Sequence, residues 1–205
     1  MNETVGPEDV RTAAAACREA LSGVVDLDWS GLAGGLEWSC RQTLEHIPGT
    51  QINYASQLAL AAKERLPRAR GGEDQLTVAE LLLTVEVNAA ILEHVLRAAP
   101  ASARAFHAAG MADPSGFAAM GCDEVLIHTS DIASGFEIDF KPPEDLCGRV
   151  LARLFPWAPT DVGHWDALRW ANGRAALPGM GRQDENWRWH CAPLSEWDGQ
   201  VARRT

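Results

Sequence analysis

The sequence lacks any apolar run near the roughly 18 residues that a membrane-spanning helix requires, so we expect no membrane partner. Its first residues are acidic and lack a basic segment followed by an apolar one, which argues against a signal peptide. Lysine is also scarce, since Lys63 and Lys141 are the two lysines among 18 basic residues. With 28 acidic residues the formal net charge is -10, and nucleic acid is therefore not an expected partner.

The five cysteines form no Cys-x-x-Cys pair, are odd in number and lie far apart in the chain. This pattern argues against a structural zinc finger. It favours free thiols in a reducing compartment, and so a cytoplasmic protein. We expect most of these cysteines to be small buried hydrophobic residues.

Helical periodicity dominates the first two thirds of the chain. Apolar residues recur at helical spacing in four segments, approximately residues 7–24, 39–54, 77–98 and 115–135. The loops between them carry no strand pattern. A chain of 205 residues is long enough for one well-filled core. We therefore predict an all-α protein with a single domain over residues 1–205, a four-helix bundle at about 7–136 and an extension at about 137–205.

Local signals define the second of these segments. Ser39, with Gln42 three residues later, has the spacing of a capping box, so the helix should begin there. Pro48 removes a backbone donor and crowds the preceding turn, so we expect a bend or a local break at that point. A polar, glycine-containing stretch at residues 68–74 is interpreted as a hinge before the third helix.

The last third of the chain carries six of the eight tryptophans. Short helices are expected at about residues 143–155 and 161–174, and Trp187 and Trp189 alternate as in a short strand. Tryptophan most often covers apolar surface, here either the side of the bundle or a dimer interface. An exposed tryptophan surface would favour a homodimer.

A polar stripe in the fourth segment has the composition of a metal site. On a helix, Glu124 and His128 are four residues apart and Asp131 follows three later, so all three project from one face. Imidazole and carboxylate suit a divalent cation such as zinc, but one helix face supplies only two ligands comfortably. His46 is the best candidate for the third.

These residues also have an ordinary structural interpretation. Glu and His four residues apart usually form a surface pair worth about 0.2 to 0.5 kcal/mol. A single histidine such as His46 is more often a satisfied core residue. Apolar neighbours of the stripe, among them Val125 and Ile132, favour a metal, because buried charges require a partner.

The combination of motifs is similar to that of a known family. Trp38 and the serine after it precede His46 by eight and seven residues. Glu124, His128 and Asp131 form a second motif, with three and then two residues between them. Together they resemble the DinB-like superfamily, and more narrowly the mycothiol-dependent maleylpyruvate isomerase family. Further stretches that look similar lie at residues 110–117, 154–156 and 173–174.

The resemblance implies a bundle with up-down-down-up order that carries one divalent metal on His46, Glu124 and His128. Zinc is the expected ion, with nickel and manganese as alternatives. Asp131 matches a characteristic aspartate and is expected to support the catalytic site from behind the ligands. Relatives bind a low-molecular-weight thiol, so the resemblance implies mycothiol, or a similar thiol, as co-substrate.

The implied activity is thiol transfer to, or cis-trans isomerisation of, a small electrophilic substrate. Arg174 or Arg188 is the candidate for holding a substrate carboxylate, since this chain is expected to lack the separate C-terminal domain of the isomerase type. A metal-dependent hydrolase on the same site is the alternative, with Asp131 or Glu45 as base. A non-catalytic metal-binding or stress protein of the same fold is the third hypothesis.

Overall fold

The computed structural model describes residues 4–67 and 76–203, so the hinge predicted at 68–74 lies outside the described residues. Helices make up most of its regular structure: α1 (Asp9–Leu21), α2 (Cys40–Ala59), α3 (Val78–Ala98), α4 (Pro114–Gly135), α5 (Glu144–Leu154) and α6 (His164–Ala171). Further elements are two short 3-10 helices, η1 (Ser22–Val24) and η3 (Leu194–Glu196), and the strands β1 (Ala105–His107) and β2 (Gly110–Ala112). The mainly helical class predicted from the sequence is confirmed.

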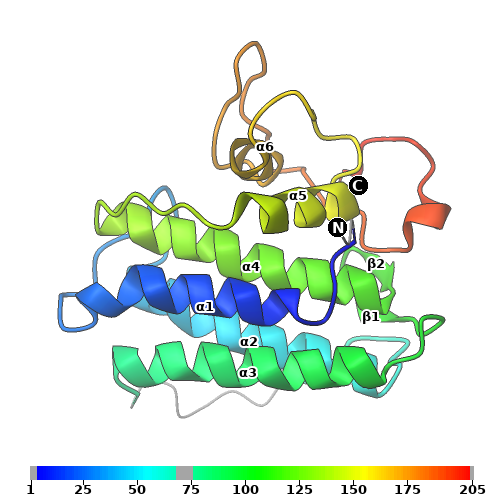
Figure 1. Ribbon diagram of the computed structural model, residues 1–205, viewed down its shortest axis with the longest axis horizontal. Coiled ribbons are helices and arrows are strands. Elements are labelled where there is room, and N and C mark those ends of the chain that lie inside the picture. The colour runs from blue at the N-terminus through cyan, green and yellow to red at the C-terminus, as the bar shows by residue number, and fades with distance from the viewer. Residues whose placement is uncertain (1–3, 68–75, 204–205) are drawn as a thin grey trace.

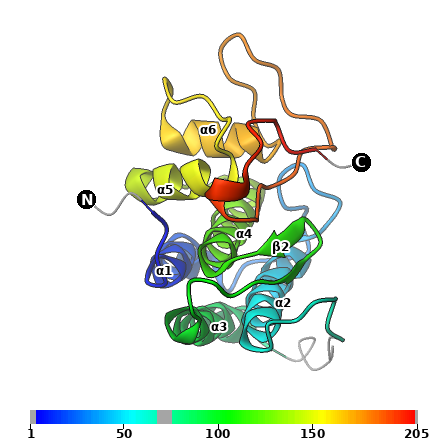
Figure 2. The ribbon, with the colours of Figure 1, turned by 90° about the vertical axis from the view of Figure 1, so that its right-hand side faces the viewer.

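Helices α1 to α4 form a bundle that brings distant parts of the sequence together. In Figure 1, α1 and α4 run in one direction, and α2 and α3 run in the opposite one. Seen along the bundle, α4 packs against both α1 and α2, while α3 closes the other side (Figure 2). This order places α2 beside α4, the two helices that carry the predicted metal ligands.

Side-chain caps set where α2, α3 and α4 begin. Ser39 accepts a hydrogen bond from the backbone of Gln42, and the Gln42 side chain accepts one from the backbone of Ser39, so the predicted capping box is confirmed. Thr77 and Glu80 form an equivalent box at the start of α3. Asp113 caps α4, where its carboxylate accepts a backbone N–H of the first turn. The helix starts are therefore decided by local chemistry.

Helix α2 continues through Pro48, so the predicted local break does not occur. Pro48 is buried, and its neighbours Leu44 and Ile47 are fully buried in the core. The carbonyl oxygen of Pro48 accepts a hydrogen bond from Nδ2 of Asn88 on α3 at 3.0 Å. Packing in the bundle thus outweighs the cost of a proline, which would interrupt an isolated helix.

A short hairpin replaces what the sequence indicated as a plain loop after α3. Its strands pair antiparallel, with Phe106 opposite Met111. Each strand has three residues, too few for a period of two to stand out in the sequence. The N–H of Phe106 donates to the carbonyl of Ala62 at 2.8 Å, which ties the hairpin to the residues that follow α2.

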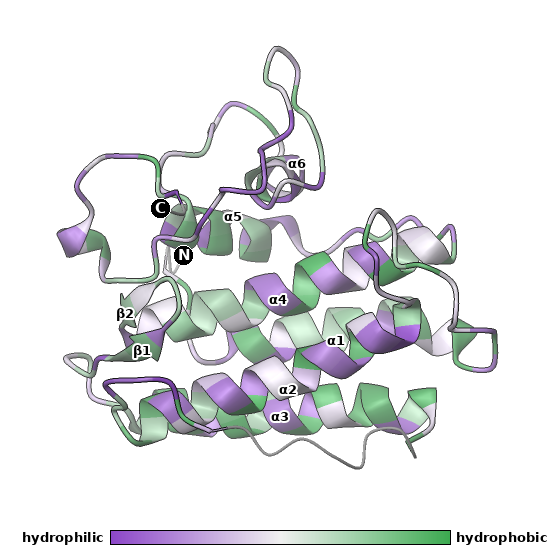
Figure 3. Cartoon of the chain, turned by 180° about the vertical axis from the view of Figure 1, so that it is seen from behind, coloured by the Kyte–Doolittle hydropathy of each residue, from purple (hydrophilic) through white to green (hydrophobic). Residues whose placement is uncertain are grey.

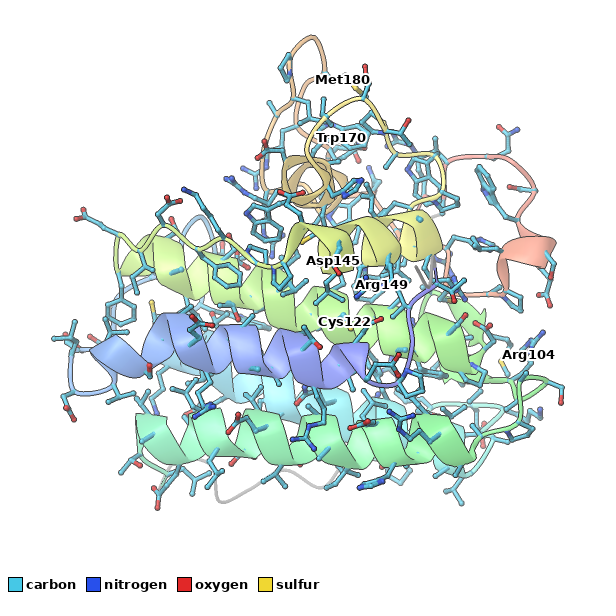
Figure 4. The ribbon with its side chains drawn as sticks, in the orientation of Figure 1. Arg104, Cys122, Asp145, Arg149, Trp170 and Met180 are labelled. Carbon is cyan, nitrogen blue, oxygen red and sulfur yellow. The ribbon has the colours of Figure 1, made fainter. Side chains whose placement is uncertain are left out.

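The extension packs on the bundle through α5, and α6 packs on α5 (Figure 1). Both helices lie within the ranges predicted from the sequence. The guanidinium of Arg149 joins α5 to α1, since it binds Asp9 at 2.6 Å and Asp145 at 2.9 Å (Figure 4). The strand suggested around Trp187 is wrong, because this residue forms only an isolated bridge with Arg203.

Seven of the eight tryptophans are buried or half-buried, and Trp38 alone is exposed, at 44%. The rings of the extension therefore cover the side of the bundle. A homodimer remains a prediction, without the exposed tryptophan surface that suggested it.

One continuous set of buried apolar side chains runs from the bundle into α5 and α6. Hydrophilic and hydrophobic residues alternate along the faces of α2 and α4 (Figure 3). Among the described residues, no helix is long and apolar enough to cross a membrane. The continuous set of buried apolar side chains means that one core extends across both the bundle and the extension.

Candidate metal centre

The three predicted ligands meet at the contact between α2 and α4. Nε2 of His46 lies 3.2 Å from Oε2 of Glu124, and Nε2 of His128 lies 3.3 Å from the same oxygen. One potential ligand atom from each residue falls within 4.8 Å of the other two. Glu124 and His128 share a face of α4 because they are one turn apart, whereas His46 arrives from α2 only through packing.

This donor set fits a zinc ion. Tetrahedral zinc holds nitrogen and oxygen ligands at about 2.0 to 2.1 Å, which separates the ligand atoms by roughly 3.3 to 3.4 Å. The His46–Glu124 and His128–Glu124 separations, 3.2 and 3.3 Å, are already close to this distance between zinc ligands. Two imidazoles and one carboxylate are also a common set for catalytic zinc, which keeps a further position open.

Asp131 orients His128. Its Oδ2 lies 3.1 Å from Nδ1 of His128, so Nδ1–H donates to the carboxylate and Nε2 faces the other ligands. Both carboxylate oxygens of Asp131 also accept from Arg174, whose Nε and Nη2 lie 2.9 and 3.0 Å away. Asp131 therefore lies behind His128, between this residue and Arg174, and its supporting role in a metal site stays a prediction.

Arg174, the substrate-binding candidate from the sequence, is held by contacts within the protein. Its Nε and Nη2 bind Asp131, and its Nη1 donates to the carbonyl of Asn172 at 3.2 Å. It lines neither of the pockets described below. The bidentate contact instead gives Arg174 a positioning role, because it holds the carboxylate that holds His128.

The alternative candidate, Arg188, lies elsewhere. Its Nη2 is 3.4 Å from the carbonyl of Ala108 in the hairpin loop, and it lines neither pocket. The structure therefore gives no support to a substrate contact by this residue.

The ionisation of the site follows from these contacts. Burial raises the pKa of Glu124, but hydrogen bonds and charges from His128 and His46 outweigh it, so this pKa lies well below its usual range. Burial lowers the pKa of His128, but Asp131 and Glu124 outweigh it and raise this pKa to about 9. The pKa of Asp131 is lowered, because His128 and Arg174 outweigh the effect of burial. Without metal, the site is a network of paired charges.

A second buried acid lies behind Glu124. Asp123 is almost fully buried, and burial raises its pKa to about 7. Its two oxygens accept from Nδ2 of Asn172 and Nε1 of Trp189, both at 2.9 Å. These two bonds connect α4 to the extension, so Asp123 joins the two parts of the protein rather than supplying a ligand.

Three further side chains surround the ligands. The hydroxyl of Tyr54 donates to Oε1 of Glu124 at 3.2 Å, which leaves Oε2 directed at the histidines. Oγ1 of Thr50 lies 3.1 Å from Nε2 of His46. The Trp38 ring lies 5.1 Å from the His46 ring and 6.4 Å from the His128 ring, measured between centroids. These contacts restrict the orientation of each ligand.

Two pockets open at the ligands. The first has a volume of about 130 Å³ and is lined by polar and aromatic groups that include His46, Glu124, Arg65 and His107. The second, of about 260 Å³, is lined by Leu36, Glu37, Trp38 and His128. One pocket therefore borders His46 and Glu124, and the other borders His128.

Some of these residues carried a signal in the sequence. Thr50 and Tyr54 follow His46 by four and eight residues, so they share its face of α2. Arg65 and His107 lie outside the long helices and had no periodic signal. Only the fold brings these two to the site.

Comparisons with known proteins leave the family unassigned. No family model, curated protein or solved structure matches the chain.

Proposed function

We propose that this chain is a cytoplasmic, metal-dependent enzyme of DinB-like fold that activates a low-molecular-weight thiol, mycothiol or a similar one. The thiol would be transferred to a small electrophilic substrate, or would add reversibly to it and allow cis-trans isomerisation. One observation carries the proposal: His46, Glu124 and His128 place their ligand atoms within 4.8 Å of one another between two pockets. The similarity of their motifs to the mycothiol-dependent family supports the choice of thiol.

The protein residues have distinct tasks in this proposal. His46, Glu124 and His128 would hold the metal, with zinc as the expected ion and nickel or manganese as alternatives. When bound, zinc lowers the pKa of a coordinating thiol enough to give the thiolate, which is the nucleophile, at neutral pH. Tyr54 keeps one oxygen of Glu124 occupied, so the other is available as a ligand. Asp131 fixes the tautomer of His128.

A metal-dependent hydrolase is the alternative on the same site, and it needs a general base near the open position. The bases suggested by the sequence are poorly placed, because Asp131 binds His128 and Arg174, and Glu45 pairs with Arg41 at 2.8 Å. Two carboxylates line the two pockets: Glu124, which is a proposed ligand, and Glu37, which is not. The thiol reaction needs no such base.

The first experiment measures metal content after reconstitution of the full chain with zinc. Wild type should hold about one zinc per chain, and His46→Ala and His128→Ala should lose it. His94→Ala is the matched control, since His94 is exposed on α3 and outside the proposed ligand set. Unchanged metal content in His46→Ala would remove this residue from the ligand set.

The second experiment tests the thiol. Cobalt(II) replaces zinc, and mycothiol is titrated while the thiolate-to-cobalt absorption in the near ultraviolet is followed. A saturable band that is absent in His128→Ala is expected. Metal binding without any thiolate band would contradict thiol activation and favour the hydrolase. Absence of metal binding would leave the third hypothesis, a non-catalytic protein of this fold.

A further inference from the structure

Helix α3 is apolar on two sides. Its inner side, which faces the bundle, includes the buried residues Leu81 and Leu92. On its outer side, Leu83, Val87 and Ile91 are 57%, 47% and 39% exposed. Because these three residues are four apart, they lie within about 80° of one another around the helix and form one outer face. A helix that is apolar on both sides is typical of one buried on both sides, so the outer face is expected to have a partner.

The charged residues of α3 point elsewhere. Glu86 and Glu93 lie toward α1, where they pair with Arg18 and Arg11 at 2.8 and 3.9 Å. Asn88 lies toward α2, where it donates to a backbone carbonyl at 3.0 Å. Figure 2 shows α3 at a corner of the bundle, with α1 and α2 beside it and no other described helix over its outer side. The middle of the outer face is therefore both uncovered by described elements and uncharged.

The net charge of the chain favours such a face for contact between two copies. At a net charge of -10, two copies repel each other over most of their surfaces. An uncharged apolar face removes this repulsion at the point of contact and supplies the burial that drives association.

The spacing of the outer face fits a second copy of the same chain. Leu83 and Ile91 lie four residues before and four residues after Val87. A twofold axis at Val87 therefore places this residue against Val87 of the second copy, and Leu83 against Ile91 of the second copy, with the two helices antiparallel. The same apolar residues thus serve both sides of the contact.

The ends of the face are complementary in the same arrangement. Glu80 and His94 are exposed, and each lies seven residues from Val87. Antiparallel packing places Glu80 of one copy near His94 of the other and opposes the two helix dipoles. Parallel packing would instead bring the two Glu80 carboxylates together, which like charges disfavour.

We infer that α3 forms the interface of a homodimer, in which the outer faces of two copies pack antiparallel about a twofold axis at Val87. The inference is independent of the proposed function, because it uses no residue of the candidate metal centre. A single pair of helices gives an interface at the low end of the usual size range, so association in the micromolar range is expected.

Sedimentation equilibrium of the full chain over a concentration series tests the dimer. The average mass of wild type should rise from 22.2 kDa toward twice that value. Val87→Asp brings two carboxylates together at the axis and should raise the dissociation constant of the dimer at least about 100-fold. Val201→Asp is the matched control, since Val201 is also 47% exposed but lies in the C-terminal segment, and it should dimerise like wild type. Circular dichroism checks that both variants keep their helices.

Cross-linking through an introduced cysteine tests the arrangement. With copper phenanthroline as oxidant, Val87→Cys should form a disulfide between two copies, because the axis brings the two positions together. Ala98→Cys, on the same side of α3, is the control and should not, because the two positions would lie about 33 Å apart in the antiparallel dimer. The native cysteines are buried and should not interfere.

Other results overturn the inference. A wild-type chain that stays monomeric up to about 0.5 mM rejects the homodimer, and the outer face of α3 would then belong to a different partner. Equal effects of Val87→Asp and Val201→Asp place any interface away from α3. Cross-linking of Ala98→Cys without cross-linking of Val87→Cys rejects the antiparallel order. Metal content enters none of these results, so they are distinguishable from failure of the proposed function.

Discussion

Whether His128 can bind a metal at the candidate site depends on which of its ring nitrogens carries the proton. A histidine binds metal through a nitrogen that carries no proton, and the contact of Nδ1 with Asp131 leaves Nε2 for that purpose. Arg174 in turn holds Asp131 through two donors. Arg174 thus holds Asp131, and Asp131 holds His128 at the candidate metal site.

Replacement of Asp131 by Ala should weaken zinc binding about 10- to 100-fold, because His128 loses the partner that fixes its ring. Competition with a chromophoric chelator measures this affinity. Asp166→Ala, a change at an exposed position on α6, is the control and should leave it unaltered. If Asp131→Ala retains wild-type affinity while its thermal unfolding is unchanged, Asp131 does not position His128.

The protein's own cysteines are poor candidates for the nucleophile. All five are buried, and burial raises the pKa of Cys17 and of Cys191 to about 11. At neutral pH these thiols are protonated and unreactive. Because burial raises the pKa values of these cysteines, an external thiol is favoured as the nucleophile.

We expect the native chain to react only slowly with Ellman's reagent at pH 8, and to show five thiols once denatured. The time course of absorbance in the two states measures this difference. A thiol that reacts within seconds in the native chain would show that the protein offers a nucleophile of its own, which would weaken the case for a co-substrate thiol.

At the scale of the elements, the turn that follows α2 contains a non-glycine residue in a conformation that favours glycine. Ala61 has a φ of 45°, in the left-handed region that favours glycine. The turn is closed by the N–H of Ala62, which donates to the carbonyl of Gln57 at 3.0 Å. This turn leads directly to Arg65, so its geometry places one wall of the smaller pocket.

Ala61→Gly should stabilise the protein by about 0.5 to 1 kcal/mol, because relief of the left-handed strain exceeds the added entropy of the unfolded chain. Ala59→Gly, at the last residue of the helix, relieves no such strain and should destabilise the protein by at most about 0.5 to 1 kcal/mol. Urea unfolding at equilibrium measures both free energies. A destabilised Ala61→Gly would indicate that the turn has a different backbone conformation in solution.

At the scale of the whole molecule, Arg153 connects α5, the start of α4 and the C-terminal segment. It is 4% exposed and forms an ion pair with Asp113. Its guanidinium also binds Oγ of Ser115 and the carbonyls of His190 and Cys191. Since Trp189 contacts both Asp123 and His107, this arginine helps to hold the segment that borders the site.

Arg153→Met should lower the free energy of unfolding by about 3 to 5 kcal/mol, because it leaves the Asp113 carboxylate without its partner. Arg203→Met, which removes an exposed pair with Asp184, should cost no more than about 1 kcal/mol. Urea unfolding distinguishes the two, and limited proteolysis should cut the Arg153→Met chain first near residues 190–203. Equal stability of both variants would contradict the connecting role of Arg153.

Most of the helical framework could be predicted from the sequence, because its signals are local. The capping box at Ser39 and the shared face of Glu124 and His128 depend on neighbours within one turn. Pro48 shows the limit of such signals, since packing against α3 keeps α2 continuous where local preference favours a break. The hairpin was missed because its two strands are too short to show a period.

The sequence by itself determined the helical class, most of the helix starts and the pair of candidate ligands on α4, since each follows from spacing along a single helix. The tertiary structure decided that His46 lies 3.2 Å from Glu124, across 78 residues of chain. It also decided that Arg174 binds Asp131, and that Arg65 lines the smaller pocket. These are contacts between distant segments, whose energy arises only when the helices pack.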